Sequence, residues 1–168
     1  MIKVFILSLM ANLALTLISF LALPPQVAIH FGLNGMADGW APSYVHVLVM
    51  TTVQLFVFCC IYFVSRLIPF FPPEMVSIPN NEYWLSPVNK PQAIEKINNL
   101  LWRAGSAIFM LLLVVNLLML HANLSKTDKL NLWVFYTVLG AFFCYIIWLL
   151  IFSFYRAFRI PDHGGKGV

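Results

Sequence analysis

The chain has 168 residues, of which 61% are hydrophobic and 10% are charged, and its mean hydropathy is +0.87. Soluble domains are only about 45–50% apolar and about 25% charged. This composition excludes an ordinary water-soluble enzyme and a disordered tail, because too little polar surface is available to coat a globule. The net charge of +4 and the pI of about 9.1 require no nucleic-acid partner, since basic residues beside membrane helices account for them.

Long uncharged stretches separate the charged residues, and each can house a helix of the roughly 20 residues that cross about 30 Å of hydrocarbon. We predict four spans, near residues 4–23, 44–68, 100–121 and 130–155. They have scarcely any polar face, which argues against buried helices of a soluble bundle. The first span is too long for a signal-peptide core and lacks a cleavage pattern, so we expect an uncleaved anchor. The predicted fold class is all-α, a four-helix transmembrane bundle forming a single integral membrane domain over residues 1–168.

Polar residues of the first span recur at spacings of four, four and three, which places them on one stripe of a helix. This intramembrane polar stripe consists of Ser8, Asn12, Thr16 and Ser19. In hydrocarbon such a stripe turns toward neighbouring helices, where its amide and hydroxyl groups form hydrogen bonds. The expected partners of Asn12 from the second span are Thr51, Thr52 and Gln54. Helix packing is the favoured interpretation, and a substrate path is the alternative.

The remaining spans carry few chemical signals. Asn116 is the lone amide deep in the third span, and Gly140 with Cys144 forms a small-x-x-x-small packing step in the fourth. The adjacent Cys59 and Cys60 are expected to pack as small hydrophobic residues. Since no acidic or basic residue lies in the middle of a span, the sequence offers no obvious proton relay or ion-coupling site. It also contains no motif for intramembrane proteolysis or phosphate binding, so a non-enzymatic protein is predicted.

The segment between the first two spans, residues 24–43, predicts a small ordered extracytoplasmic loop. Two prolines end the first helix, and residues 26–31 are β-branched and partly alternating, which favours a strand. The Asn-Gly pair at 34–35 and the Asp-Gly pair at 38–39 are predicted turns, because these residues tolerate a positive φ. The aromatic residues suited to the membrane interface are Trp40 and Tyr44.

Histidines and a carboxylate near this loop raise the question of a metal site. His30, Asp38 and His46 could in principle gather a divalent cation. In the favoured interpretation, His30 bonds a loop carbonyl and Asp38 caps a turn through its own side chain, so no metal ion or other cofactor is predicted. His46 and His121 lie near the outer ends of their spans and are interpreted as interfacial residues.

Residues 69–99 form the predicted cytoplasmic loop. Its prolines interrupt any helix as far as Pro87, and Tyr83 with Trp84 is expected to pin this irregular segment at the membrane surface. Pro91 suits a first helical turn. The apolar residues that follow have helical spacing, which predicts a cytoplasmic amphipathic helix that either lies on the inner leaflet or leads into the third span. A groove for docking a partner is the alternative.

Basic residues are distributed unevenly about the span ends, which predicts the orientation in the membrane. One side carries Lys3, Arg66, Lys90, Lys96, Arg103, Arg156, Arg159 and Lys166. The other side carries only Lys126 and Lys129. We therefore expect both termini, including the tail 156–168, to be cytoplasmic.

Two motifs in this chain resemble those of a known family. The first runs from Pro25 to Trp40 and contains Pro25, His30, Phe31, Gly35, Asp38, Gly39 and Trp40. The second contains Pro79, Asn80, Tyr83, Trp84 and Pro87. Their order and spacing are similar to those of the bacterial membrane family called domain of unknown function 1648, which includes relatives of the SdpI immunity protein. The resemblance implies a multi-span protein of the bacterial inner membrane, with an unknown or immunity-like role and no established catalytic residues.

Three classes of function follow. The leading hypothesis is a non-enzymatic membrane protein whose outer loop senses, binds or shields against an extracytoplasmic peptide or small molecule. The alternative is a subunit of an oligomeric transporter or channel, in which Ser8, Asn12, Thr16 and Gln54 line a path. A homo-oligomer or another membrane partner is compatible with either. An enzyme is the least favoured class. Its catalytic or metal site would have to be built around His30, Asp38 and His46.

Overall fold

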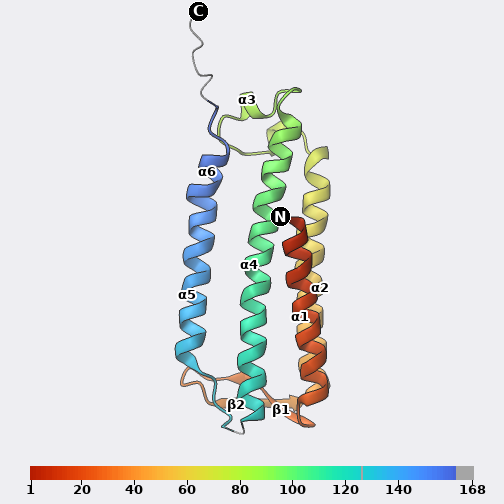
Figure 1. The fold of residues 1–168 in the computed structure, drawn as a ribbon, viewed down its shortest axis with the longest axis vertical. Helices are drawn as coiled ribbons and strands as arrows, with labels where there is room; N and C mark the ends of the chain where they lie inside the picture. The colour runs from red at the N-terminus through yellow and green to blue at the C-terminus, as the bar shows by residue number, and fades with distance from the viewer. Residues whose placement is uncertain (126, 162–168) are drawn as a thin grey trace, which may run out of the picture.

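A computed structural model describes residues 1–125 and 127–161, so Lys126 and Lys166 lie outside the described residues. Four long helices run side by side along one axis (Figure 1), and each is long and apolar enough to cross a membrane. They are α1 (Ile2–Ala22), α2 (Ser43–Leu67), α4 (Lys90–Leu124) and α5 (Leu132–Trp148). The last of them continues through a π-helical segment (Leu149–Ser153) into the short helix α6 (Phe154–Ala157). The four predicted spans are thus present as helices.

The third long helix differs most from its predicted bounds. We predicted a loop to residue 99, but α4 begins at Lys90 and has 35 residues, against 21 in α1. Pro91 lies in its first turn, where the missing N–H has no helical partner to lose. At about 1.5 Å per residue, α1 matches the roughly 30 Å of hydrocarbon, whereas α4 extends beyond it. The segment for which we predicted an amphipathic helix is therefore helical and continuous with the third span. This agrees with the alternative in which it leads into that span and not with the one in which it lies on the inner leaflet.

A β-hairpin connects α1 to α2 at one end of the molecule, which we call the hairpin end. Strand β1 (Gln26–Phe31) was predicted correctly, and it pairs antiparallel with β2 (Ala37–Pro42). The predicted turn at Asp38-Gly39 is wrong, because both residues lie within β2. Gly39 lies opposite His30, and a Cβ on Gly39 would come within 2.8 Å of the His30 Cβ. A close cross-strand approach, not turn geometry, therefore requires glycine here.

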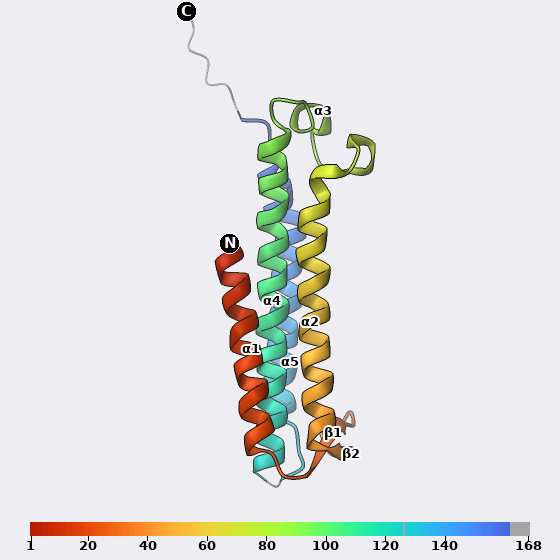
Figure 2. The same ribbon diagram turned by 90° about the vertical axis from the view of Figure 1, so that its right-hand side faces the viewer.

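The opposite end, the α3 end, holds the segment that joins α2 to α4. It contains two 3₁₀ turns, Ile68–Phe70 and Pro73–Met75, and the four-residue helix α3 (Asn81–Trp84). The N-terminus of α1 stops well short of this end, whereas α2 and α4 continue toward it (Figure 2). The irregular character predicted for this segment is confirmed as far as Asn80, since its prolines remove backbone donors and restrict φ, whereas the short helix α3 was not predicted.

The core lies between α1, α2 and α4. Its apolar cluster consists of Phe5, Leu9, Trp102 and Phe109. Gly105 of α4 is buried beneath it, and a Cβ there would come within 2.5 Å of Phe5 Cε2 and 2.7 Å of Ile61 Cδ1. Glycine thus allows three helices to approach one another at this point, as in other close membrane-helix contacts.

The fourth helix does not complete a symmetric bundle. None of the residues of α5 is buried, and α4 is the long helix it packs against, with α1 and α2 on the far side of α4 (Figure 1). The predicted packing step at Gly140 and Cys144 is wrong, because nothing among the described residues lies within 4 Å of a Cβ on Gly140, and Cys144 is exposed. The architecture is a three-helix core with a fourth helix attached to one side.

Candidate functional site

The hairpin is attached to the core through one buried amide. The Asn123 side chain of α4 accepts a hydrogen bond from Ala28 N at 2.7 Å and donates to Ala28 O at 3.1 Å and to Met119 O at 2.9 Å. Val27 and Ala28 are fully buried against the helices. At the strand ends, Pro25 O accepts a bond from Ser43 N at 2.9 Å. Strand β1 is therefore held at its middle by a side chain that satisfies both backbone groups of one residue.

The connection between α4 and α5 completes this cap. Leu130 N donates to Gly35 O at 2.8 Å, and Ala37 N donates to Asp128 O at 2.9 Å. Gly35 has a φ of 78°, and a Cβ on it would lie 2.9 Å from Leu130 O. The predicted turn at Asn34-Gly35 is thus present. The absence of a side chain on Gly35 also allows the α4–α5 connection to pack against this turn. Sequence analysis treated the two connections separately and did not find their contact.

The outward face of the hairpin carries a paired histidine and aspartate. Nδ1 of His30 lies against Oδ1 of Asp38, and the two side chains are 72% and 53% exposed. We expected each residue to bond the backbone instead, which is wrong, because adjacent strands place the two side chains together. Leu33, in the turn between the strands, is 93% exposed, and Trp40 is also exposed. We call this set of exposed hairpin residues the hairpin face: His30, Leu33, Asp38 and Trp40.

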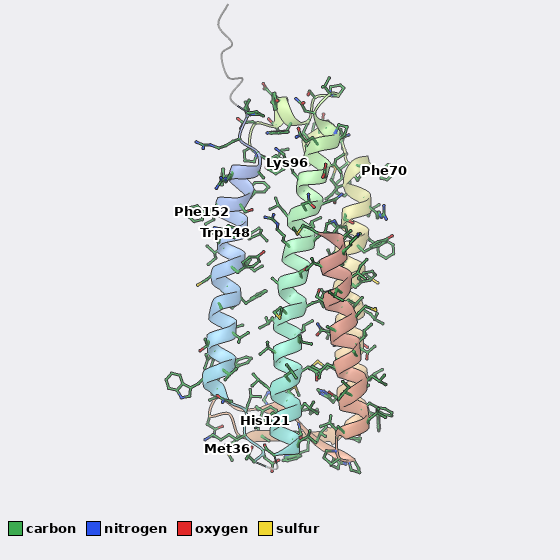
Figure 3. The ribbon with its side chains drawn as sticks, viewed as in Figure 1. Met36, Phe70, Lys96, His121, Trp148 and Phe152 are labelled. Atoms are coloured by element: carbon green, nitrogen blue, oxygen red, sulfur yellow. The ribbon has the colours of Figure 1, made fainter. Side chains whose placement is uncertain are left out.

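The three residues considered for a metal site are not brought together. His46 is buried, not interfacial as we had predicted, and its Nε2 lies 3.2 Å from Asn116 Oδ1 on α4. No group of three His, Cys, Asp or Glu side chains suited to a metal ion occurs within residues 1–125 and 127–161. His121 is exposed and lines a groove of about 560 Å³ between α4 and α5 near the hairpin end, where Figure 3 labels it.

A buried polar network lies in the core beneath the cap. The hydroxyl of Thr16 donates to Asn12 O at 3.0 Å and accepts from Gln54 Nε2 at 3.0 Å and from Asn116 Nδ2 at 3.3 Å. The Asn116 side chain also contacts His46, whose Nε2 lies 3.2 Å from Asn116 Oδ1. The network links α1, α2 and α4 through side chains that are each less than 5% exposed.

The polar stripe of α1 turns inward as expected, but with other partners. Asn12 donates to Phe109 O at 2.8 Å and to Ser8 O at 2.9 Å, so its neighbour is α4 and not the second span. The Ser8 and Ser19 hydroxyls donate to backbone oxygens of α1 at 2.8 and 2.9 Å. The oxygens Asn12 Oδ1 and Gln54 Oε1 are buried and have no hydrogen-bond partner among the described residues.

The second motif forms a lock at the α3 end. Phe158 O, just beyond α6, accepts bonds from Trp84 Nε1 at 2.9 Å and from Asn80 Nδ2 at 2.8 Å. Trp84 is fully buried, so it pins this segment through contacts within the protein, and its predicted position at the level of the membrane surface stays a prediction. Lys96 Nζ lies 3.5 Å from the centroid of the Trp84 ring and donates to Ala157 O at 2.6 Å. This motif therefore fastens the last helix to α4.

The other members of the motif support this lock. Asn80 adopts a left-handed conformation, with a φ of 54°, which asparagine tolerates better than most residues. Tyr83 packs edge-on against Trp84, and its backbone oxygen accepts bonds from Ser86 and Asn89. Pro79 is half-buried and Pro87 is exposed. Phe158 and Lys96 were not among the predicted site residues, since nothing in the sequence connects them with residue 84.

These features define a multi-pass membrane protein with four long apolar helices and a role that is unknown. Residues 7–55 match the family model described as Domain of unknown function (DUF1648), which confirms the predicted resemblance to this family over the first motif, whereas the second motif lies outside the matched residues. No curated protein and no solved structure matches the chain. The matched segment contains the polar stripe, the whole hairpin, His46 and Gln54, whereas Asn116 and Asn123 lie outside it.

Proposed function

We propose that this chain is a non-enzymatic protein of the bacterial inner membrane that recognises an extracytoplasmic peptide or small molecule through the hairpin face. Both termini are cytoplasmic in this proposal, because the basic residues of the α3 end outnumber those of the hairpin end. Sensing the molecule and protecting against it, as an immunity-like protein does, are two forms that such recognition can take.

The observation that carries this proposal is the combination of a rigid support with an exposed, chemically mixed surface. Asn123 and the connection after α4 hold the hairpin by bonds to backbone groups. The exposed face then offers a histidine paired with an aspartate, together with apolar and aromatic side chains. Surfaces that combine a fixed backbone, aromatic residues and a few oriented polar groups are typical of recognition sites, since little ordering entropy is lost on binding.

Site-specific photo-crosslinking tests the proposal. A photoreactive residue is placed at Leu33, on the hairpin face, and at Val88, which is 86% exposed at the α3 end, as the matched control. We expect a defined adduct at Leu33 in intact cells and none at Val88. The captured molecule is identified by mass spectrometry, and its Kd is then measured for the unsubstituted protein, His30→Ala and Asp38→Asn.

We expect both variants to bind the molecule at least tenfold more weakly. A hydrogen bond between the ligand and a charged or polar side chain contributes roughly 1.4 kcal/mol or more, and each variant removes one such side-chain group. Two results contradict the proposal: equal adducts at Leu33 and Val88, or a Kd that is unchanged in both variants. A reporter fused to either terminus tests the orientation independently.

A second candidate function is transport by an oligomer, and one observation favours it. The buried oxygens Asn12 Oδ1 and Gln54 Oε1 have no partner among the described residues, and amide oxygens are common ligands of hard cations and water in membrane proteins. Flux of sodium or potassium into liposomes containing the purified chain tests this candidate. Flux that is abolished by Gln54→Leu supports it, and a monodisperse monomer without flux contradicts it.

A further inference from the structure

A groove at the α3 end lies apart from the hairpin face and from the buried network. Its volume is about 570 Å³, and it is bounded by the last two turns of the fourth membrane helix and by the segment before α3. The lining residues that matter here are Asn80, Trp148, Phe152, Tyr155, Arg156 and Arg159. Figure 3 labels Trp148 and Phe152 on the upper part of this helix, toward the α3 end.

The lining changes from apolar to basic along the helix axis. Trp148, Phe152 and Arg156 follow one another at spacings of four, and all three line the groove, so they lie on the same side of the helix. The Trp148 and Phe152 side chains are 48% and 65% exposed, and both arginines are exposed beyond them. A molecule that lies along this face meets aromatic surface first and two guanidinium groups next.

The level of the membrane surface on this helix follows from α4. Arg103 is the charged residue at which the long uncharged stretch of α4 begins, and its Nη1 donates to Ser153 Oγ at 3.5 Å. Ser153 therefore lies near the depth at which charged groups first occur. Arg156 follows within one turn, at the level of lipid headgroups, whereas Trp148 lies on the hydrocarbon side.

The electrostatic character of this end favours an anion. Among the described residues, the α3 end carries five basic residues, Arg66, Lys90, Lys96, Arg156 and Arg159, and three glutamates. Within residues 1–125 and 127–161, neither Arg156 nor Arg159 has a side-chain hydrogen bond or an ion pair with an acidic residue. Guanidinium groups bind phosphate oxygens in a bidentate manner, and basic pockets beside membrane helices bind the headgroups of anionic lipids.

We propose that this groove binds an anionic phospholipid, whose phosphate pairs with Arg156 and Arg159 while an acyl chain lies along Trp148 and Phe152. The apolar wall on the hydrocarbon side and the basic wall at the surface match the two parts of one lipid molecule. Bound there, the lipid contacts both the fourth helix and the segment of Asn80, so it stabilises the attachment of α6 to the rest of the molecule.

Lipid titration of the full chain in detergent, read by native mass spectrometry, tests the proposal. The probes are phosphatidylglycerol and phosphatidylcholine with the same acyl chains. The variants are Arg156→Gln, Arg159→Gln and the double variant, with Arg66→Gln as the matched control, because Arg66 is exposed at the same end but does not line the groove. Gel filtration and circular dichroism establish that each variant is folded.

We expect tighter binding of phosphatidylglycerol than of phosphatidylcholine, and a Kd for phosphatidylglycerol that is weakened about fivefold by each arginine substitution and about 25-fold by both. Arg66→Gln is expected to change it less than twofold. Equal affinity for the two lipids, or a loss in Arg66→Gln as large as in the double variant, would overturn the proposal.

Two further arms separate the lipid from other sources of phosphate. Inorganic phosphate is expected not to displace the lipid, and phosphatidylglycerol with six-carbon chains is expected to bind more weakly than the sixteen-carbon form. Displacement by inorganic phosphate would assign the arginines to a soluble anion. Equal affinity of the short and long lipids would contradict a role for the wall formed by Trp148 and Phe152.

Discussion

The three-helix core and the fourth helix of this protein hold their positions in different ways. Helices α1, α2 and α4 are joined along their length by a buried polar network and by a close approach at Gly105. Helix α5 has no buried residue, and its polar attachments lie at or near its two ends. In lipid, apolar side chains alone give little preference for another helix over the bilayer. A helix without polar groups along its length therefore depends on bonds near its ends.

The end attachments of the fourth helix can be identified individually. At the hairpin end, Asn131 caps α5 by accepting a bond from Val134 N at 3.2 Å, directly after Leu130 bonds the hairpin. At the α3 end, Trp84 and Asn80 hold Phe158 O, and Lys96 holds Ala157 O. The comparison shows that the hairpin end and the α3 end of the molecule hold different parts of the chain in place. The hairpin end joins the α1–α2 hairpin and the α4–α5 connection to the core, whereas the α3 end attaches α6 to α3 and α4.

The largest expected effect is on the attachment of the hairpin to the core. Asn123→Ala removes the partner of both Ala28 N and Ala28 O, which lie in a buried position. At about 1–3 kcal/mol for each of the two buried groups left unpaired, we expect a loss of about 2–6 kcal/mol in the free energy of unfolding. Hydrogen exchange should accelerate at the Ala28 amide. Gln92→Ala, an exposed position in the first turn of the same helix, is the control and should leave both quantities unchanged. Unchanged exchange in Asn123→Ala would contradict this role of the side chain.

The next effect concerns the close approach within the core. Gly105→Ala places a Cβ 2.5 Å from the buried Phe5 ring, so α1 and α4 must separate. We expect about 1–3 kcal/mol of destabilisation in a thermal or steric-trapping assay. Gly140→Ala is the matched control on α5, where nothing among the described residues lies within 4 Å, and it should be neutral or slightly stabilising. Equal effects of the two substitutions would remove the distinction between core and fourth helix.

A smaller effect is expected at the lock of the fourth helix. Trp84→Phe keeps an aromatic ring but removes the indole N–H that donates to Phe158 O. A hydrogen bond of this kind contributes about 0.5–1.5 kcal/mol. The measurement is the accessibility of a cysteine placed at Ile160 to a water-soluble thiol reagent, which should increase. Trp133→Phe, at a position that is 87% exposed at the other end of α5, should leave it unchanged. If both substitutions act alike, the lock is not specific.

The smallest effect on stability is expected on the hairpin face. Asp38→Asn removes the partner of His30, but both side chains are more than half exposed. Exposed ion pairs contribute about 0–1 kcal/mol, so the melting temperature should change by little. If Asp38→Asn weakens binding of the extracytoplasmic molecule without lowering stability, the pair of His30 and Asp38 serves in recognition. A large drop in the melting temperature would instead show that the pair is a structural element of the cap.

The residues that sequence analysis placed correctly are those whose position follows from local rules. The uncharged stretches predicted the four long helices, and the spacing of Asn12, Thr16 and Ser19 predicted their inward orientation. The prolines predicted where helices end, and Pro91 predicted where α4 begins. These features depend on the backbone and on the solvent and not on which segments become neighbours.

The residues that were missed or misplaced depend on contacts between distant segments. Asn116 and Asn123 are seven residues apart, so both lie on one face of α4, and that spacing could have marked them together. Nothing local distinguishes Gly105 from Gly140, yet one is enclosed by three helices and the other faces open space. The pairing of His30 with Asp38 likewise required the strand register, which sequence patterns alone specify poorly.

The amino-acid sequence by itself determined that most of this chain lies in lipid, because long uncharged runs can satisfy their backbone groups there only as helices. It also determined the first strand of the hairpin and the family model that residues 7–55 match. Only the tertiary structure decided that three helices form the core, that one asparagine holds the hairpin and that a tryptophan lock fastens the fourth helix. The reason is physical. Helix formation is a local property of each segment, whereas hydrogen bonds and close contacts between helices depend on how whole segments pack together.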